Sequence, residues 1–185
     1  RHTAEIAGDI DAVLQRLKLR FPGVPIHLAG FGPEAGRLLE ATSGVNDLVR
    51  VVIASGDFRD NRIEDWSSYK RPVLLIHAPS AQCDIAPFFE AELVARKNRF
   101  VLVQAGYSHP EPKHNCGRAS QHILTGLEVE LADAVARWLD GAAAPATIGD
   151  PTPPIAWREQ VVSYTAPAAF GSNRLEMTLL FPAGK

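Results

Sequence analysis

Val73-Leu74-Leu75-Ile76, together with the earlier run Val51-Val52-Ile53, is the stretch of sequence that decides the fold. Both runs are apolar at consecutive positions, whereas a strand with one face in water alternates apolar with polar residues. A strand that is apolar on both faces is typical of a parallel sheet between two layers of helices. The sequence therefore predicts an α/β fold, with a parallel sheet flanked by helices.

Predicted helices and strands alternate along the chain on both sides of these runs. Ile6, Ile10, Val13, Leu14 and Leu17 share one face of a first helix, which ends where proline and glycine follow at 21–23. We predict strands at 24–29, 48–54, 73–76 and 100–103, and further helices from residue 33, at 87–97 and at about 125–139.

The pattern changes after residue 141. Residues 142–156 are rich in alanine, proline and glycine and are predicted to be a linker. Residues 157–185 contain two apolar segments, 160–164 and 175–181, which predict a C-terminal β-hairpin. We therefore expect an α/β domain over 1–141, a linker over 142–156 and a hairpin over 157–185.

Charge and hydropathy limit the partners. A net charge of -2 gives no electrostatic reason to expect nucleic acid or acidic membranes as partners. No apolar run reaches the roughly 20 residues that span a bilayer. The chain opens at Arg1 with neither an initiator methionine nor a secretory signal, so we expect further polypeptide before it.

The segment Gly30-Phe31-Gly32-Pro33-Glu34-Ala35-Gly36 lies at a predicted strand-to-helix turn and has three interpretations. The first is a nucleotide site, because residues 30–35 match G-x-G-x-x-G/A and Asp57 follows the next strand. Against it, Pro33 lacks an N–H group for a phosphate, and a helix precedes the strand. The second is a nucleophile elbow, G-x-S-x-G, with Gly32 at the serine position. The third is a tight turn without chemistry.

Two later segments carry a family resemblance. They run from His77 to Pro87 and from Cys116 to Glu128, the second with the order Cys116, His122, Gly126, Glu128. Together they resemble a bacterial branch of the α/β-hydrolase superfamily, close to serine esterases and dienelactone hydrolases. The resemblance covers about residues 1–141 and implies the C-terminal half of one such domain, a partial α/β-hydrolase fold.

The resemblance assigns roles position by position. The family's serine falls on Gly32, its triad acid on Ala81 and its triad histidine on His122, while its paired cysteines fall on Cys83 and Cys116. A Ser-His-acid triad needs the serine as nucleophile and the acid to orient the imidazole. Only the histidine is retained, so the resemblance implies a degenerate triad.

Neighbouring residues leave alternatives open. Asp84 is a candidate for a displaced acid, and His109 is a second candidate for the family histidine. Zinc binding by His109, His114, Cys83 and Cys116 matches no standard ligand spacing, so we expect no metal, and no cofactor is expected either. The residues alone allow two free thiols or one disulfide. The resemblance favours a Cys83–Cys116 disulfide, and with it a periplasmic or secreted location.

Both ends of the chain are expected to contact further polypeptide. The tail at 157–185 resembles the opening hairpin of another α/β-hydrolase domain. This resemblance implies that the sequence is a fragment of a longer protein with two such domains in tandem. The alternative is a domain-swapped hairpin. The first predicted strand has no earlier strand to pair with, and a bare apolar edge promotes aggregation. We expect the missing N-terminal half of the domain or a second chain to cover it.

Three functions remain open. The loss of the nucleophile and acid predicts a non-catalytic hydrolase-like module, which serves as scaffold or binding unit, with a small ester as candidate ligand. The alternatives are an ester or amide hydrolase completed by other polypeptide, and nucleotide binding at Gly30–Ala35. Trp66 and Tyr69, in the polar segment 57–70, are expected to line a pocket or to anchor the loop to the core.

Overall fold

The computed structural model describes two units, Arg1–Pro153 and Pro154–Lys185. The described residues are 3–59, 66, 69–79, 86–106, 124, 126–151, 157–165 and 174–182, the last two ranges as backbone only.

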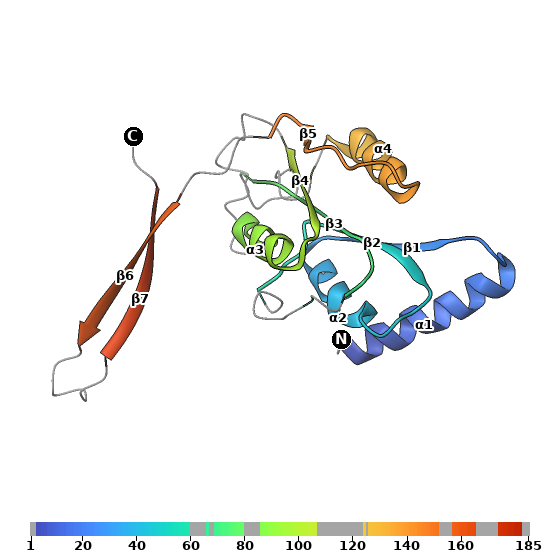
Figure 1. Ribbon diagram of the computed structural model, residues 1–185, viewed down its shortest axis with the longest axis horizontal. Helices are drawn as coiled ribbons and strands as arrows, with labels where there is room; N and C mark the ends of the chain where they lie inside the picture. Colours follow the sequence, from blue (N-terminus) through green and yellow to red (C-terminus); the bar gives the residue numbers. More distant parts are fainter. Residues whose placement is uncertain are drawn as a thin grey trace. The chain divides into compact units, whose positions relative to one another are not determined.

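The first unit is built on a five-stranded, all-parallel sheet in the order β1-β2-β3-β4-β5 (Figure 1). The strands are β1 (Ile26–Phe31), β2 (Leu48–Ala54), β3 (Val73–His77), β4 (Val101–Gly106) and β5 (Thr147–Gly149). Four of them were predicted from the sequence, and the predicted parallel α/β architecture is confirmed. The short strand β5 lies within the range predicted to be a linker.

Helices cover both faces of this sheet (Figure 1). They are α1 (Thr3–Arg20), α2 (Leu38–Thr42), α3 (Phe88–Asn98) and α4 (Glu128–Leu139). The helix predicted from residue 33 begins as the 3-10 helix η1 (Pro33–Arg37) and continues as α2. Among the described residues, no helix is long and apolar enough to cross a membrane.

The first face of the sheet packs against α1, α2 and α3. Val51, Ile53, Val73 and Leu75 point to this side, and Leu14, Leu39, Ala91 and Val94 from the helices are buried against them. Each side chain of this size that leaves water contributes about 1.5–3 kcal/mol. This cluster is therefore a main source of stability for the unit.

The second face packs against α4. Here the alternate positions Val52, Ala54, Leu74 and Ile76 contact Ala134 and Trp138 of the helix. The same two strands thus bury one set of side chains on each face, which explains their unbroken apolar sequence. Ile148 of β5 belongs to this cluster and is buried, so β5 is part of the core.

Trp66 and Tyr69 anchor the connection between β2 and β3. The Trp66 backbone N–H donates to Asn98 Oδ1 at 2.8 Å, and the Tyr69 hydroxyl lies 2.5 Å from Thr42 Oγ1. The Tyr69 ring packs edge-on against Trp66 and Phe100, with ring centroids 6.1 and 6.0 Å away. Of the two roles expected for these aromatics, the structure supports anchoring.

The second unit is a single antiparallel hairpin of β6 (Trp157–Thr165) and β7 (Arg174–Pro182). Its register runs from Trp157 opposite Pro182 to Thr165 opposite Arg174. The hairpin predicted from the sequence is present, with each strand longer than predicted.

Candidate functional site

The carboxyl ends of the parallel strands meet at one edge of the sheet, where open α/β sheets bind ligands. Four positions that bear on chemistry lie along this edge. Gly32 follows β1, Ser55 and Asp57 follow β2, and His77 ends β3. We take this edge as the candidate functional site.

The β1 turn is tight because glycine lets the chain segments approach one another. A Cβ on Gly30 would lie 2.3 Å from Leu38 Cδ1 and 2.9 Å from Ala35 Cβ. A Cβ on Gly36 would lie 1.8 Å from the Asp57 carbonyl oxygen. Glycine at 30 and 36 therefore serves close packing of η1 and of the loop after β2, as the interpretation without chemistry predicts.

Gly32 differs from these two glycines. Its φ of 90° and ψ of 175° lie in a backbone region that essentially only glycine adopts. Among the described residues, no heavy atom lies within 4 Å of a Cβ built at this position. A side chain here would face open space, but it would strain the backbone by about 1–3 kcal/mol.

Hydrogen bonds connect the β1 turn to the loop after β2. The Gly32 N–H donates to Ala54 O at 2.9 Å, and the Asp57 N–H donates to Pro33 O at 2.9 Å. The Ala35 N–H donates to Gly32 O at 3.0 Å. Two N–H groups of the G-x-G-x-x-A segment are thus already used and Pro33 has none, so the turn offers few donors to a phosphate.

The Asp57 carboxylate binds Arg59, whereas the nucleotide interpretation requires this carboxylate to bind a ribose. The Arg59 Nε donates to both carboxylate oxygens, at 3.0 and 2.9 Å, and Arg59 Nη2 also pairs with Oδ2. Partial burial raises the pKa of Asp57. The hydrogen bonds and charge of Arg59, with a smaller contribution from His77, outweigh this effect and hold the pKa below its usual value. Asp57 is therefore an ionised structural residue.

Three buried polar residues lie near the same edge. Ser55, His77 and Glu90 are almost fully buried. Ala54 pairs with Ile76 in the β2–β3 register, so Ser55 and His77 occupy the next positions on adjacent strands. The His77 ring stands edge-on to Phe88, with centroids 6.1 Å apart. Sequence reasoning did not single out Ser55 or Glu90, although a polar residue directly after an apolar strand is a usable signal.

Three of the four described non-glycine residues with positive φ follow strands of the sheet, and the fourth, Arg99, caps the C-terminus of α3. Ser55, Ala86 and Leu124 are non-glycine residues with positive φ, of 55°, 123° and 56°. They follow β2, β3 and β4 in turn, and all three are buried. Non-glycine residues in such conformations cluster at functional sites, where the surrounding structure maintains them. This strain supports the choice of this edge as the candidate site.

Comparison with known proteins identifies no relative. No family model, curated protein or solved structure matches the chain. The all-parallel α/β sheet is shown by the strands themselves, whereas the hydrolase family rests on sequence motifs alone and stays a hypothesis.

The other predicted site residues lie outside the described residues. These are the triad positions Ala81 and His122, the cysteines Cys83 and Cys116, and the alternatives Asp84, His109 and His114. The degenerate triad, the disulfide and the zinc alternative therefore remain predictions. Within the described ranges, no group of three His, Cys, Asp or Glu side chains is placed to hold a metal.

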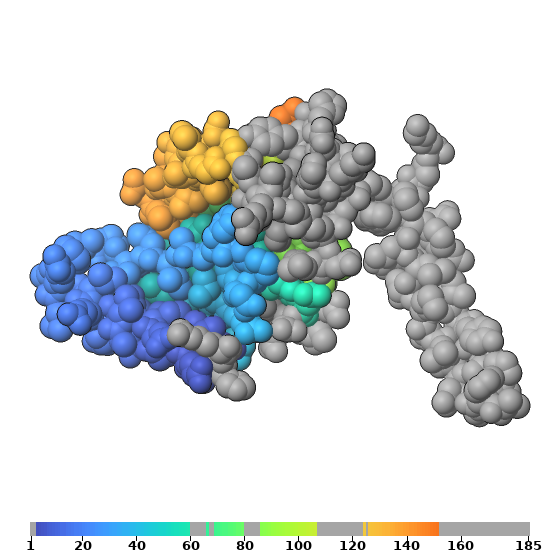
Figure 2. All heavy atoms as spheres, turned by 180° about the vertical axis from the view of Figure 1, so that it is seen from behind, coloured from blue at the N-terminus to red at the C-terminus, as the bar shows by residue number. Residues whose placement is uncertain are grey.

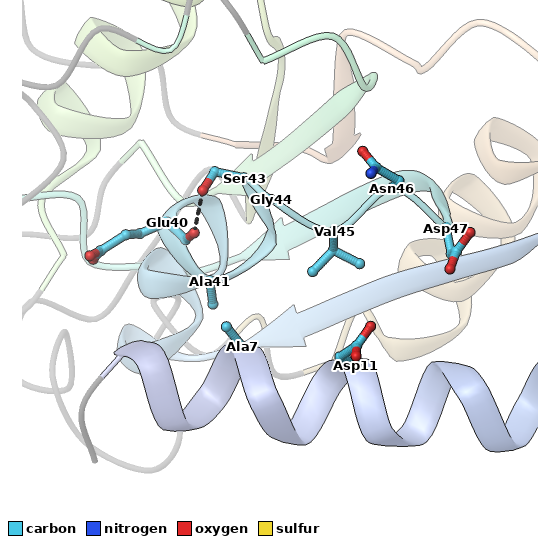
Figure 3. Close-up of a pocket in the computed structure, with 9 residues that line it drawn as sticks. All are labelled: Ala7, Asp11, Glu40, Ala41, Ser43, Gly44, Val45, Asn46 and Asp47. Carbon is cyan, nitrogen blue, oxygen red and sulfur yellow. Dashed lines mark hydrogen bonds between the residues drawn. The ribbon is translucent and has the colours of Figure 1, made fainter.

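A groove of about 550 Å³ lies at the opposite end of the strands (Figure 3). In this view Ala7 of α1 lies next to Ala41, and Asp11 lies on the side of Val45 and Asp47. Lys18 forms an ion pair with Asp47, and Thr3 donates to Glu40 at 3.0 Å. Glu40 and Asp47 thus have partners within the chain, and the groove lies between α1 and the α2–β2 connection.

Proposed function

We propose that this chain is a non-catalytic α/β-hydrolase-like module that acts as a scaffold or binding unit. The observation that carries the proposal is Gly32, which stands at the nucleophile position of the resemblance with a backbone conformation suited to glycine. A glycine supplies no oxygen to attack a carbonyl. A nucleophile elbow holds its serine on a similarly strained turn, so the missing hydroxyl, and not the conformation, supports the non-catalytic role.

The acid position supports the same proposal. The resemblance places it at Ala81, and a methyl side chain neither orients an imidazole nor stabilises an imidazolium. Asp57 offers no replacement, because its carboxylate is engaged by Arg59. His122 alone is a general base without a nucleophile to activate.

A second candidate is an ester or amide hydrolase completed by other polypeptide. The observation that favours it is the open edge of β1, which pairs only with β2 among the described strands. A covering polypeptide, whether another part of the same protein or a second chain, is the proposed partner at this edge.

Ester hydrolysis tests the proposal. We expect the chain to hydrolyse p-nitrophenyl acetate no faster than an equal concentration of its His122→Ala variant, since an isolated imidazole lacks the rest of the triad. Hydrolysis that is lost on His122→Ala, in a variant with unchanged melting temperature, would contradict a non-catalytic role. It would favour an active hydrolase instead.

A further inference from the structure

Helix α3 exposes apolar side chains where a surface helix is normally polar. Its inner face is buried through Phe88, Ala91 and Val94. On its outer face the Phe89 side chain is 48% exposed and the Leu93 side chain is 36% exposed. These two residues lie four positions apart on one helix, so their side chains are neighbours and form one apolar patch. Scattered exposed apolar residues need no explanation, but an adjacent pair opposite the buried face of a helix is suited to a contact.

Basic side chains continue this patch towards the end of α3. Arg96 lies three positions after Leu93 and seven after Phe89, on the same side of the helix, and Arg99 caps the C-terminus. Both arginines are exposed. Neither takes part in an ion pair within the part of the chain that the structure describes. The α3 surface, which consists of Phe89, Leu93, Arg96 and Arg99, thus has an apolar first half and a basic second half.

The order of apolar and basic residues argues against a second α3 as the partner of this surface. Two copies of a helix that a two-fold axis packs along their length run either antiparallel or parallel. Antiparallel pairing places Phe89 and Leu93 against the arginines of the mate, and parallel pairing places arginine against arginine. Neither arrangement brings apolar groups together and pairs cations with anions. The partner must therefore present acidic groups to Arg96 and Arg99.

Glu92 argues against an acidic membrane as the partner. It is exposed on the outer face of α3, four positions before Arg96. Helices that bind acidic lipid surfaces have a wide apolar face bordered by cations, whereas this outer face has two large apolar residues and an acid beside them. A protein segment can place an uncharged or basic group opposite Glu92, which a continuous anionic surface cannot do.

An acidic helix that runs antiparallel to α3 matches the α3 surface from end to end. The first turn of a helix favours acidic residues, because its free N–H groups carry partial positive charge. In the antiparallel arrangement this acidic first turn lies beside Arg96 and Arg99, and the following turns lie beside Phe89 and Leu93. Apolar contact then supplies the affinity, and the charges set the orientation.

We propose that the outer face of α3 is a docking surface for an acidic amphipathic helix of a partner protein. Its acids lie against Arg96 and Arg99, and its apolar side chains lie on Phe89 and Leu93. This inference rests on the proposed function as a binding unit, because it names the class of partner. The surface belongs to one short helix, so the complex is weak and reversible. Phe88 of the same helix packs on His77, so docking takes place beside the candidate site.

Fluorescence anisotropy with a labelled synthetic peptide tests the proposal. The probe is a helical peptide with glutamates in its first turn and leucines four positions apart after them, and its control has glutamine in place of glutamate. We expect saturable binding of the acidic peptide that weakens as salt is added, and binding of the control that is about three- to tenfold weaker. No saturable binding, or equal binding of both peptides, would overturn the proposal.

Substitutions on α3 locate the binding site. Arg96→Glu should raise the dissociation constant of the acidic peptide about tenfold, whereas Arg16→Glu, at an exposed position of α1, should leave it unchanged. Leu93→Ala should weaken binding about fivefold, and Val129→Ala, at an exposed position of α4, is its control. Figure 2 shows both control helices, α1 in blue and α4 in yellow to orange. Controls that weaken binding as much as the α3 variants would contradict docking on α3.

A reversed charge pair and two further assays separate the possible occupants. A peptide with lysine in place of glutamate should bind the Arg96→Glu variant more tightly than the wild-type chain, and the opposite preference would contradict direct pairing. Self-association in sedimentation velocity that Leu93→Ala abolishes would assign the surface to a second copy. Binding to phosphatidylserine vesicles that Arg96→Glu abolishes would assign it to a membrane, and either result overturns the proposal. Ester hydrolysis does not enter these measurements, so failed docking and a failed non-catalytic role are distinguishable.

Discussion

At the scale of single residues, glycines shape the candidate site because they let backbone segments pack closely and turn sharply. Gly36 allows the loop after β2 to pass directly against η1, and Gly32 turns the chain in a conformation that other residues avoid. The G-x-G pattern was visible in the sequence. Its purpose was not, because nucleotide binding, an elbow and a packed turn all require glycine at these spacings.

Replacing Gly36 by alanine tests the packed turn. The added Cβ would lie 1.8 Å from the Asp57 carbonyl oxygen, so backbone has to move, and we expect a loss of about 2–3 kcal/mol in the free energy of unfolding. Gly8→Ala is the control, since no atom lies within 4 Å and alanine favours the α1 helix by about 0.5–1 kcal/mol. Urea denaturation measures both. Equal stability of Gly36→Ala and wild type would contradict the packing.

The ion pair of Asp57 predicts a dependence of stability on pH. Its folded-state pKa is lowered, so the ionised carboxylate stabilises the fold above the unfolded-state pKa of about 4, and this contribution is lost as the pH falls through the folded-state value. The stability difference between wild type and Asp57→Asn should therefore shrink below about pH 4. Thermal unfolding across pH 2–7 tests this, and a difference that persists at the acid end would contradict the lowered pKa.

At the scale of elements, apolar runs in the sequence predicted the longer strands, whereas the short strand β5 was not predicted. The four longer strands of the sheet were predicted from short apolar runs, and those of β2 and β3, Val51 to Ile53 and Val73 to Ile76, are buried on both faces. Strand β5 is three residues long within an alanine- and proline-rich segment. Its pairing with β4 is a long-range contact, which no local periodicity records.

Truncation of Ile148 distinguishes a core strand from a linker. Ile148→Ala should cost about 2–4 kcal/mol, because the side chain is buried in the α4 cluster. The exposed neighbour Thr147→Ala should change the free energy of unfolding by less than about 0.5 kcal/mol. Chemical denaturation compares the two. A cost for Ile148→Ala as small as that for Thr147→Ala would mean that β5 contributes nothing to the core.

At the scale of the whole molecule, the five-stranded sheet has two edges, β1 and β5, and each pairs with one neighbour among the described strands. Its first face is covered by three helices, and its second by α4, whose apolar cluster includes no residue of β1. The sequence already indicated an uncovered first strand.

The central claim concerns the nucleophile, and covalent labelling tests it most directly. The protein is treated with a serine-directed fluorophosphonate, and any modified peptide is located by mass spectrometry. We predict no labelled serine in residues 1–185, because Gly32 occupies the nucleophile position. A labelled serine within the chain, at Ser55 or elsewhere, would contradict the assignment and identify an active hydrolase site.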